Sequence, residues 1–244
     1  MRPVFTVYST FLQRGYDNLI HDIALQDLPV TVCIDRAALA SGDGPTHHGI
    51  FDVAFLGQIP GIPLWAPADF ESLSRALTDS LDSGHPACIR YPNAKPLDEA
   101  LFPYGEYPFR RNFPDGIQLD ALIVTYGRIA EEALAAAVQL KSEGITCGVL
   151  LCEQLLPISA PADALAKVVG NTDTPILVLE EGIKTGGLGM MLREALHDRA
   201  MPNRLEIAAI EDPFAASEKG RKLIATMGID RTAVAAKVRK LLES

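Results

Sequence analysis

The sequence predicts an α/β fold made of two units, each a parallel β-sheet wound with helices. Short apolar runs alternate along the chain with longer segments that carry apolar residues at helical spacing. A proline-rich stretch separates an earlier set of these elements from a later one. The length of 244 residues suits two modest α/β domains. We therefore expect one unit over 1–92, a linker over 93–117 and a second unit over 118–244.

The first unit is expected to begin with a strand and then alternate between helices and strands. Residues 28–34 form an almost continuous apolar run, which is typical of a strand buried on both faces. Asp69 precedes a helical pattern and is a plausible N-cap, with Ser72 and Arg75 on the exposed side. The expected strands are 1–7, 28–34, 62–66 and 87–91, and the expected helices are 11–24, 48–56 and 67–83.

The stretch over 93–117 is rich in proline and aromatic residues. Proline restricts its own backbone and that of the residue before it, so regular helix is not expected there. After it, Gly144 is positioned to end a long helix. Strands are expected over 121–126, 146–151, 175–179 and 205–210, and helices over 128–142, 161–169, 188–198 and 230–242. This alternation favours a parallel sheet.

The composition limits the kinds of partner. The net charge of −9 disfavours nucleic acid, which needs a basic surface. No uninterrupted apolar stretch reaches about 18 residues, so no membrane span is expected. The four cysteines form no C-x-x-C pair and are interpreted as reduced core residues of a cytoplasmic protein.

Two polar phrases follow predicted strands. Residues 8–17 read YSTFLQRGYD, and residues 43–49 read DGPTHHG. Open α/β sheets bind their ligands at the carboxyl ends of the strands, so both phrases are candidates for a site. A histidine near neutral pH can move a proton or bind a carboxylate. The residues alone do not decide between His47 and His48.

These phrases, with Ile34-Asp-Arg-Ala37 between them, resemble the 1-deoxy-D-xylulose-5-phosphate synthase family of the transketolase superfamily. The resemblance implies that the first unit is an incomplete pyrimidine-binding domain for thiamine diphosphate. It implies that the second unit is a transketolase C-terminal domain. The resemblance in this unit rests on the loop at Glu180–Gly189. Within that unit, Cys152–Ile158 replaces the family's usual sequence. In the family this domain mainly builds the assembly.

The resemblance also implies roles for residues of the cofactor and substrate sites. Phe11 would stack on the cofactor's aminopyrimidine ring, beside Tyr8, since aromatic stacking holds a flat ring in one plane. Tyr8, Asp43 and His47 would lie around the substrate, with Asp43 and His47 as the catalytic pair. The position of His47 in the D-G-x-T-H phrase selects it over His48.

The phosphate of the acceptor would be bound by Arg14 and Arg90. Two guanidinium groups suit this task because their paired bonds fix orientation as well as charge. The family often has another arginine two residues after the tyrosine of its R-Y-P sequence, where this chain has Asn93. That side of the pocket is expected to be weaker.

The implied reaction condenses pyruvate with glyceraldehyde 3-phosphate with loss of carbon dioxide, in isoprenoid precursor, thiamine and pyridoxal synthesis. The family's chain is far longer. Its domain for the diphosphate and magnesium, and its activating glutamate, are expected on a separate N-terminal-half subunit, with or without homo-oligomerisation. Gly42-Asp43-Gly44 begins a diphosphate-type phrase, but no asparagine follows until Asn93, so no metal ligand is assigned to this chain.

Two other interpretations remain open. The chain is a truncated, inactive or structural fragment whose incomplete sheet leaves an edge for another chain to pair with. Alternatively, it is a β-type subunit of a 2-oxoacid dehydrogenase, which shares both folds. The phrase over 8–17 speaks against the dehydrogenase.

Overall fold

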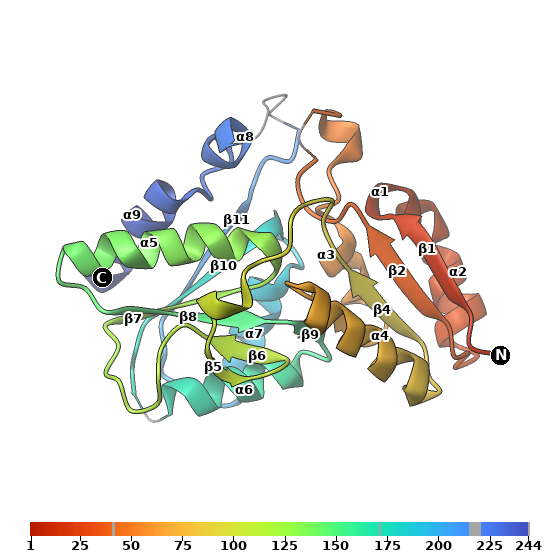
Figure 1. Cartoon of the computed structure of the whole chain (residues 1–244), viewed down its shortest axis with the longest axis horizontal. Helices are drawn as coiled ribbons and strands as arrows, with labels where there is room; N and C mark the ends of the chain where they lie inside the picture. Colours follow the sequence, from red (N-terminus) through yellow and green to blue (C-terminus); the bar gives the residue numbers. More distant parts are fainter. Residues whose placement is uncertain (41, 171, 215–220, 244) are drawn as a thin grey trace.

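The computed structural model describes residues 1–40, 42–170, 172–214 and 221–243. Within them the chain forms two mainly parallel sheets with helices packed against them, which confirms the predicted fold class (Figure 1). The strands of the first sheet, in spatial order, are β1 (Val4–Tyr8), β2 (Thr31–Asp35), β4 (Ala87–Arg90), β3 (Leu64–Trp65) and β9 (Gln154–Leu156). Those of the second are β11 (Leu205–Ile210), β10 (Ile176–Ile183), β7 (Ala121–Thr125), β8 (Cys147–Cys152), β6 (Phe109–Arg111) and β5 (Tyr104–Glu106).

Helices connect most of these strands. The first predicted helix, over 11–24, is irregular: it starts at Ser9, tightens into a 3-10 turn at Gly15 and widens into a π-helical turn over Leu19–Ala24. The α-helices are α1 (Ser9–Leu12), α2 (Tyr16–Asn18), α3 (Asp52–Leu56), α4 (Phe70–Ser83), α5 (Ala130–Ser142), α6 (Ser159–Val169), α7 (Leu188–Asp198), α8 (Arg221–Thr226) and α9 (Arg231–Glu243). None of the helices in the described ranges is long and apolar enough to cross a bilayer.

The second sheet is covered on both faces (Figure 1). Successive side chains of a strand point to opposite faces. On β7, Leu122 and Val124 therefore belong to the core that contains α6 and α7, whereas Ile123 belongs to the core that contains α5 and α9. All three are fully buried, as expected for a central parallel strand.

The stretch over 93–117 contains strands that the sequence analysis did not assign. β5 and β6 form an antiparallel hairpin, and β6 pairs with β8 at the edge of the second sheet. Gly105 has a φ of +80° in this hairpin, and a Cβ there would lie 2.7 Å from the carbonyl oxygen of Phe109. The strands are only three residues long, so they leave no period in the sequence.

A third unassigned strand, β9, links the two sheets. β9 follows β8 directly but pairs antiparallel with β3 of the first sheet. Glu153, the residue between β8 and β9, is fully buried, and its backbone carbonyl accepts a hydrogen bond from the amide of Ala66. The segment Cys152–Ile158 therefore carries the chain from one sheet to the other.

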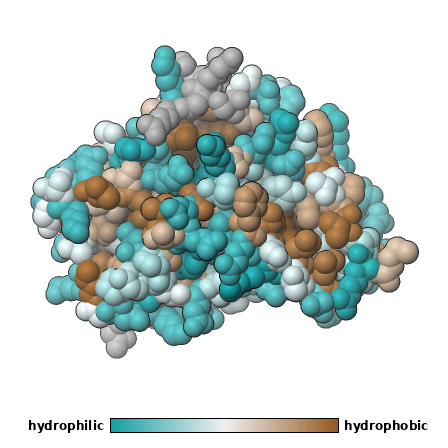
Figure 2. Space-filling model, in the orientation of Figure 1, coloured by the Kyte–Doolittle hydropathy of each residue, from teal (hydrophilic) through white to brown (hydrophobic). Residues whose placement is uncertain are grey.

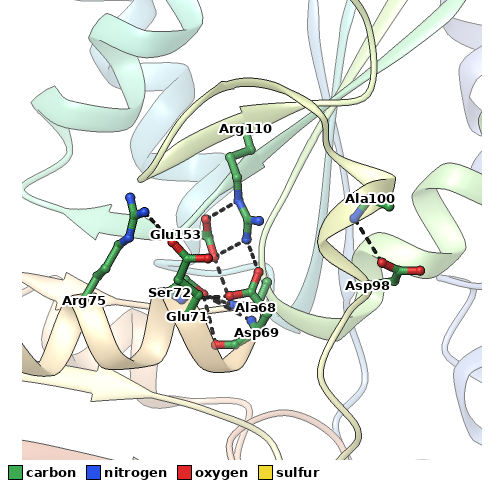
Figure 3. Close-up of polar contacts among 9 residues, drawn as sticks. All are labelled: Ala68, Asp69, Glu71, Ser72, Arg75, Asp98, Ala100, Arg110 and Glu153. Atoms are coloured by element: carbon green, nitrogen blue, oxygen red, sulfur yellow. Dashed lines mark hydrogen bonds and ion pairs between the residues drawn. The ribbon is translucent and has the colours of Figure 1, made fainter.

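A buried ionic cluster holds this crossing (Figure 3). Arg110 of β6 donates from Nε and Nη2 to the two carboxylate oxygens of Glu153, both at 2.8 Å. Its Nη2 also lies 2.5 Å from a carboxylate oxygen of Asp69. Asp69 caps α4, which confirms that expectation, but Ser72 is buried and completes a capping box, so its expected exposure was wrong. One guanidinium thus joins the hairpin, α4 and the β8–β9 crossing.

Candidate active site

An aromatic surface lies at the carboxyl end of β1. Tyr8 ends the strand and Phe11 lies in the first turn after it, with the two rings nearly parallel and their centroids 5.4 Å apart. His47, from the second phrase, meets the edge of Phe11 with 6.4 Å between ring centroids. Phe11 is 47 % exposed although it is a large apolar side chain. We call these three residues the aromatic wall.

The loop after β2 reaches the wall through a strained backbone. Arg36 and Ala38 have φ values of +54° and +80°, in the region that favours glycine. Such strain in a non-glycine residue persists where surrounding structure enforces it, and it clusters at functional sites. Gly49 shows how closely the loops approach, because a Cβ there would lie 2.4 Å from the carbonyl oxygen of Arg36 and 2.8 Å from the Cβ of Ser9. Glycine at this position lets the two phrases meet.

The structure gives the two neighbouring histidines different surroundings. His47 is partly exposed on the aromatic wall, and its Nδ1 lies 3.0 Å from the hydroxyl of Thr46. His48 is 2 % exposed, and its Nδ1 accepts a hydrogen bond from the amide of Ala40. Of the two rings, His47 is therefore the more exposed, and it lies on the aromatic wall.

Arg36 is a member of this site to which the sequence analysis gave no role. Its guanidinium carbon lies 4.6 Å from the ring centroid of Tyr8, and its Nη1 is 3.4 Å from a carboxylate oxygen of Asp43. The signal was present, because Arg36 belongs to the Ile34–Ala37 phrase directly after a predicted strand. Arg36 and Asp43 are thereby brought to the aromatic wall.

Arg14 and Arg90 have different surroundings in the structure. Arg14 is exposed and has no partner in the described part of the chain. Arg90 is 4 % exposed, donates from Nε to Asp52 at 3.1 Å and lies over the ring of Tyr126. Burial disfavours the charged guanidinium of Arg90, but its interactions with the fully buried Asp52 and with the Tyr126 hydroxyl outweigh this effect and raise its pKa. The two arginines assigned to the acceptor's phosphate thus differ in exposure and in partners, and their joint binding of a phosphate stays a prediction.

Comparisons with known proteins identify the two parts of the chain. The transketolase pyrimidine-binding domain family matches residues 1–96, and the transketolase C-terminal domain family matches residues 117–234. The chain belongs to the transketolase family. The 1-deoxy-D-xylulose-5-phosphate synthase of Syntrophotalea carbinolica is 37 % identical over 99 % of this chain, and that of Gloeobacter violaceus is 35 % identical over 100 %. In both cases the chain spans 38 % of the relative's length.

Solved structures of this family share the fold. A split-gene transketolase, described as an inactive β4 tetramer, has a TM-score of 0.81 and 24 % identity, covering 99 % of this chain and 77 % of its own. A Pichia stipitis transketolase in complex with sedoheptulose 7-phosphate has a TM-score of 0.79 and 20 % identity, covering 99 % of this chain and 34 % of its own. At these identities the likeness concerns the fold alone.

The transketolase family implies thiamine diphosphate as cofactor, and the aromatic wall fits part of it. The half-exposed ring of Phe11 offers a flat apolar surface for an aminopyrimidine ring, backed by Tyr8. The residues that the structure describes contain no group of three or more His, Cys, Asp or Glu arranged to hold a metal ion.

The glycine-rich loop of the second transketolase domain is closed by hydrogen bonds to a carboxylate of the same segment. Glu180 is buried, and its carboxylate accepts hydrogen bonds from the backbone amides of Leu188 and Gly189 at the start of α7. Gly187 allows this approach, because a Cβ there would lie 2.6 Å from a Glu180 oxygen. The loop therefore closes a strand-to-helix turn around its own carboxylate.

The buried carboxyl of Glu180 should make the free energy of unfolding depend on pH. Burial raises its pKa from 4.5 to about 7, although the two amides and the Tyr126 hydroxyl oppose this. The folded protein then binds the proton more tightly than the unfolded chain, so stability falls by about 3 kcal/mol as pH rises from 4.5 through 7. We expect Glu180→Gln to remove this slope, measured by urea unfolding at pH 5 and pH 8. An equal slope in both proteins would contradict this origin.

Proposed function

We propose that this chain supplies the pyrimidine-side and acceptor-side groups of a thiamine diphosphate-dependent 1-deoxy-D-xylulose-5-phosphate synthase. The reaction joins pyruvate to glyceraldehyde 3-phosphate with loss of carbon dioxide. The observation that carries the proposal is the half-exposed aromatic wall at the carboxyl end of β1, with His47 at its edge. The identity to synthases of this name over nearly the whole chain supports the choice of reaction.

In this proposal the side chains of the wall orient the reactants and move a proton. Thiamine diphosphate, when bound, supplies the carbon centre that takes the two-carbon unit from pyruvate. Phe11 and Tyr8 hold its pyrimidine ring in plane. His47, with Nδ1 beside Thr46, presents an imidazole that can donate a proton to the aldehyde oxygen of the acceptor. Asp43 keeps Arg36 beside the wall.

The two arginines assigned to the acceptor's phosphate differ in what supports them. Arg14 is exposed and unpaired in the described residues, so it is available to an anion. Arg90 is already bound to Asp52 and packed on Tyr126. We therefore assign it a structural role, to hold these two residues in place.

We further propose that the remaining groups of the site come from another polypeptide. They are the diphosphate and magnesium ligands and the activating glutamate. β1 ends its sheet, with Val4 and Phe5 about half exposed, and Figure 2 shows hydrophobic surface on this side of the molecule. An apolar strand edge that pairs with no further strand of the described residues suits pairing with a strand of another chain. We also propose that the assembly acts in the cytoplasm. Within this chain, residues 93–117 join the two domains.

Phe11 provides the test of cofactor stacking. In the active assembly we expect Phe11→Ala to raise the apparent Kd for thiamine diphosphate by about tenfold or more, since stacking and burial are both lost. Phe11→Tyr keeps the ring and serves as the matched control. An unchanged Kd in Phe11→Ala would remove the aromatic wall from the cofactor site.

The choice of acceptor separates this proposal from a 2-oxoacid dehydrogenase. Carbon dioxide released from pyruvate should depend on glyceraldehyde 3-phosphate and not on lipoamide. Release that depends on lipoamide would favour the dehydrogenase subunit. Release by no assembly would favour the structural fragment.

A further inference from the structure

An ion pair of the second domain binds the backbone of the loop after β2, which is described over 36–40 and 42–49. The amide of Leu39 donates to Oε1 of Glu181 at 3.1 Å, and the carbonyl of Leu39 accepts from Nη2 of Arg128 at 3.2 Å. Arg128 and Glu181 also bind each other, from Nε to Oε2 at 3.0 Å and from Nη2 to Oε1 at 2.6 Å. The pair therefore binds both backbone polar groups of one loop residue.

The contact at Leu39 is buried and has a fixed geometry. Glu181 is 2 % exposed and Leu39 is 5 % exposed. Hydrogen bonds to an ionised partner are stronger than those between neutral groups. A guanidinium that binds both oxygens of a carboxylate is held in one orientation, so its remaining bond to the loop is directed as well. Leu39 is therefore fixed relative to the second domain.

The residue before Leu39 is strained and is paired with the second phrase. Ala38 has a φ of +80°, and its amide and carbonyl exchange two hydrogen bonds with Gly49, at 2.6 and 2.8 Å. A residue other than glycine keeps such a backbone only where the surrounding structure enforces it. The contact at Leu39 enforces it from the second domain.

The residue after Leu39 is bound to the same phrase. The amide of Ala40 donates to Nδ1 of His48, a buried ring, at 3.1 Å. His47 is the neighbour of His48 and carries the ring that lies on the aromatic wall. The place of Leu39 therefore decides where the backbone of His47 lies.

We propose that Arg128 and Glu181 are positioning residues, which act from the second domain to set the place of His47 on the aromatic wall. A second bond between the domains supports this role. The amide of Ile183 donates to the carbonyl of Ile50, just beyond the phrase, at 3.0 Å. The effect on catalysis rests on the proposed function, whereas the positioning of the loop does not.

Amide hydrogen exchange of the full 244-residue chain tests the positioning without cofactor or turnover. Arg128→Lys keeps a positive charge beside the buried Glu181, but an ammonium cannot reproduce the three directed hydrogen bonds of the guanidinium. We expect the amides of Ala38, Ala40 and Gly49 to exchange about tenfold faster, the loss of one charge-assisted bond, while both sheets exchange as in the wild type. These three amides donate to atoms of the loop and not to the ion pair, so their exchange reports on the loop itself.

Arg239→Lys is the matched control. Arg239 binds both oxygens of Glu143 just past the other end of α5, so its replacement should leave exchange in the loop unchanged. Arg128→Gln/Glu181→Gln leaves no buried carboxylate unpaired and should accelerate the same loop amides. Loop exchange equal to that of the wild type in both Arg128 variants would overturn the proposal. Acceleration of equal size in every peptide would also overturn it, because the pair would then be a general stabilising contact.

Turnover of the active assembly gives a second readout. Arg128→Lys should lower kcat about tenfold, because a displaced catalytic group loses rate. In a His47→Ala background the same substitution should cost little further, since no imidazole is left to place. An equal loss in both backgrounds would overturn the positioning of His47. Faster exchange in the loop with an unchanged kcat would instead count against the catalytic role of His47 in the proposed function alone.

Discussion

Replacing Arg110 with alanine is expected to lower the free energy of unfolding by about 3 to 5 kcal/mol, as found when one member of a buried ion pair is removed. The change leaves the carboxylate of Glu153, fully buried, without its guanidinium. It also removes the charge beside Asp69, whose pKa is lowered in part by Arg110 against the effect of burial. The lost contacts join β6 and the β8–β9 crossing to α4. We therefore expect the substitution to destabilise both sheets in a single unfolding transition. Urea unfolding followed by circular dichroism measures it.

Arg75 offers a matched control in the same region (Figure 3). It pairs with Glu71 on the surface of α4, with both side chains 54 % exposed, so Arg75→Ala should cost less than about 1 kcal/mol. The double variant Arg110→Ala/Glu153→Gln removes the unpaired charge and should regain part of the loss. Equal effects of Arg110→Ala and Arg75→Ala would show that the buried cluster does not hold the sheets together.

His47→Ala is expected to lower kcat of the active assembly by about 10² to 10⁴, the range for removing a general acid or base. The ring is partly exposed beside Phe11, so its loss opens no cavity in the core. The melting temperature should therefore stay close to that of the wild type. His47→Gln keeps a hydrogen-bond donor and should recover little of the rate, because an amide does not exchange a proton near neutral pH.

His21→Ala serves as the control for this prediction. His21 is exposed, and among the described residues its ring contacts Asp17 of its own helical segment, with Nδ1 3.0 Å from a carboxylate oxygen. It should leave kcat unchanged. A His47→Ala enzyme with full kcat would assign the proton transfer to another group and leave His47 as part of the surface.

The regular elements were predictable because each carries its own local signal. The buried first part of β10 reads as an apolar run over 175–179, and Asp69 is recognisable in the sequence as the N-cap of α4. In these cases the residues that form a structure are neighbours in the sequence. Tyr8, Phe11 and His47 were instead named through the resemblance carried by two short phrases, and the structure brings their rings together.

The features that were missed depend on contacts between distant residues. β9 is three residues long and exists because it pairs with β3, far earlier in the chain. Arg90 is buried because Asp52, 38 residues away, receives its guanidinium. Arg128 lies against the loop after β2 because Glu181, 53 residues away, binds its guanidinium and the carbonyl of Leu39 accepts a hydrogen bond from it. The sequence shows every arginine and every carboxylate, but it does not show which of them will pair.

The assay of product formation tests the central claim most directly. Synthesis of 1-deoxy-D-xylulose 5-phosphate from pyruvate and glyceraldehyde 3-phosphate is measured with thiamine diphosphate and magnesium. The chain is assayed alone and together with a polypeptide that carries the part of the related synthases it does not span. We expect product only from the combination. Product from the chain alone would contradict the need for outside groups, and no product from the combination would contradict the proposed reaction.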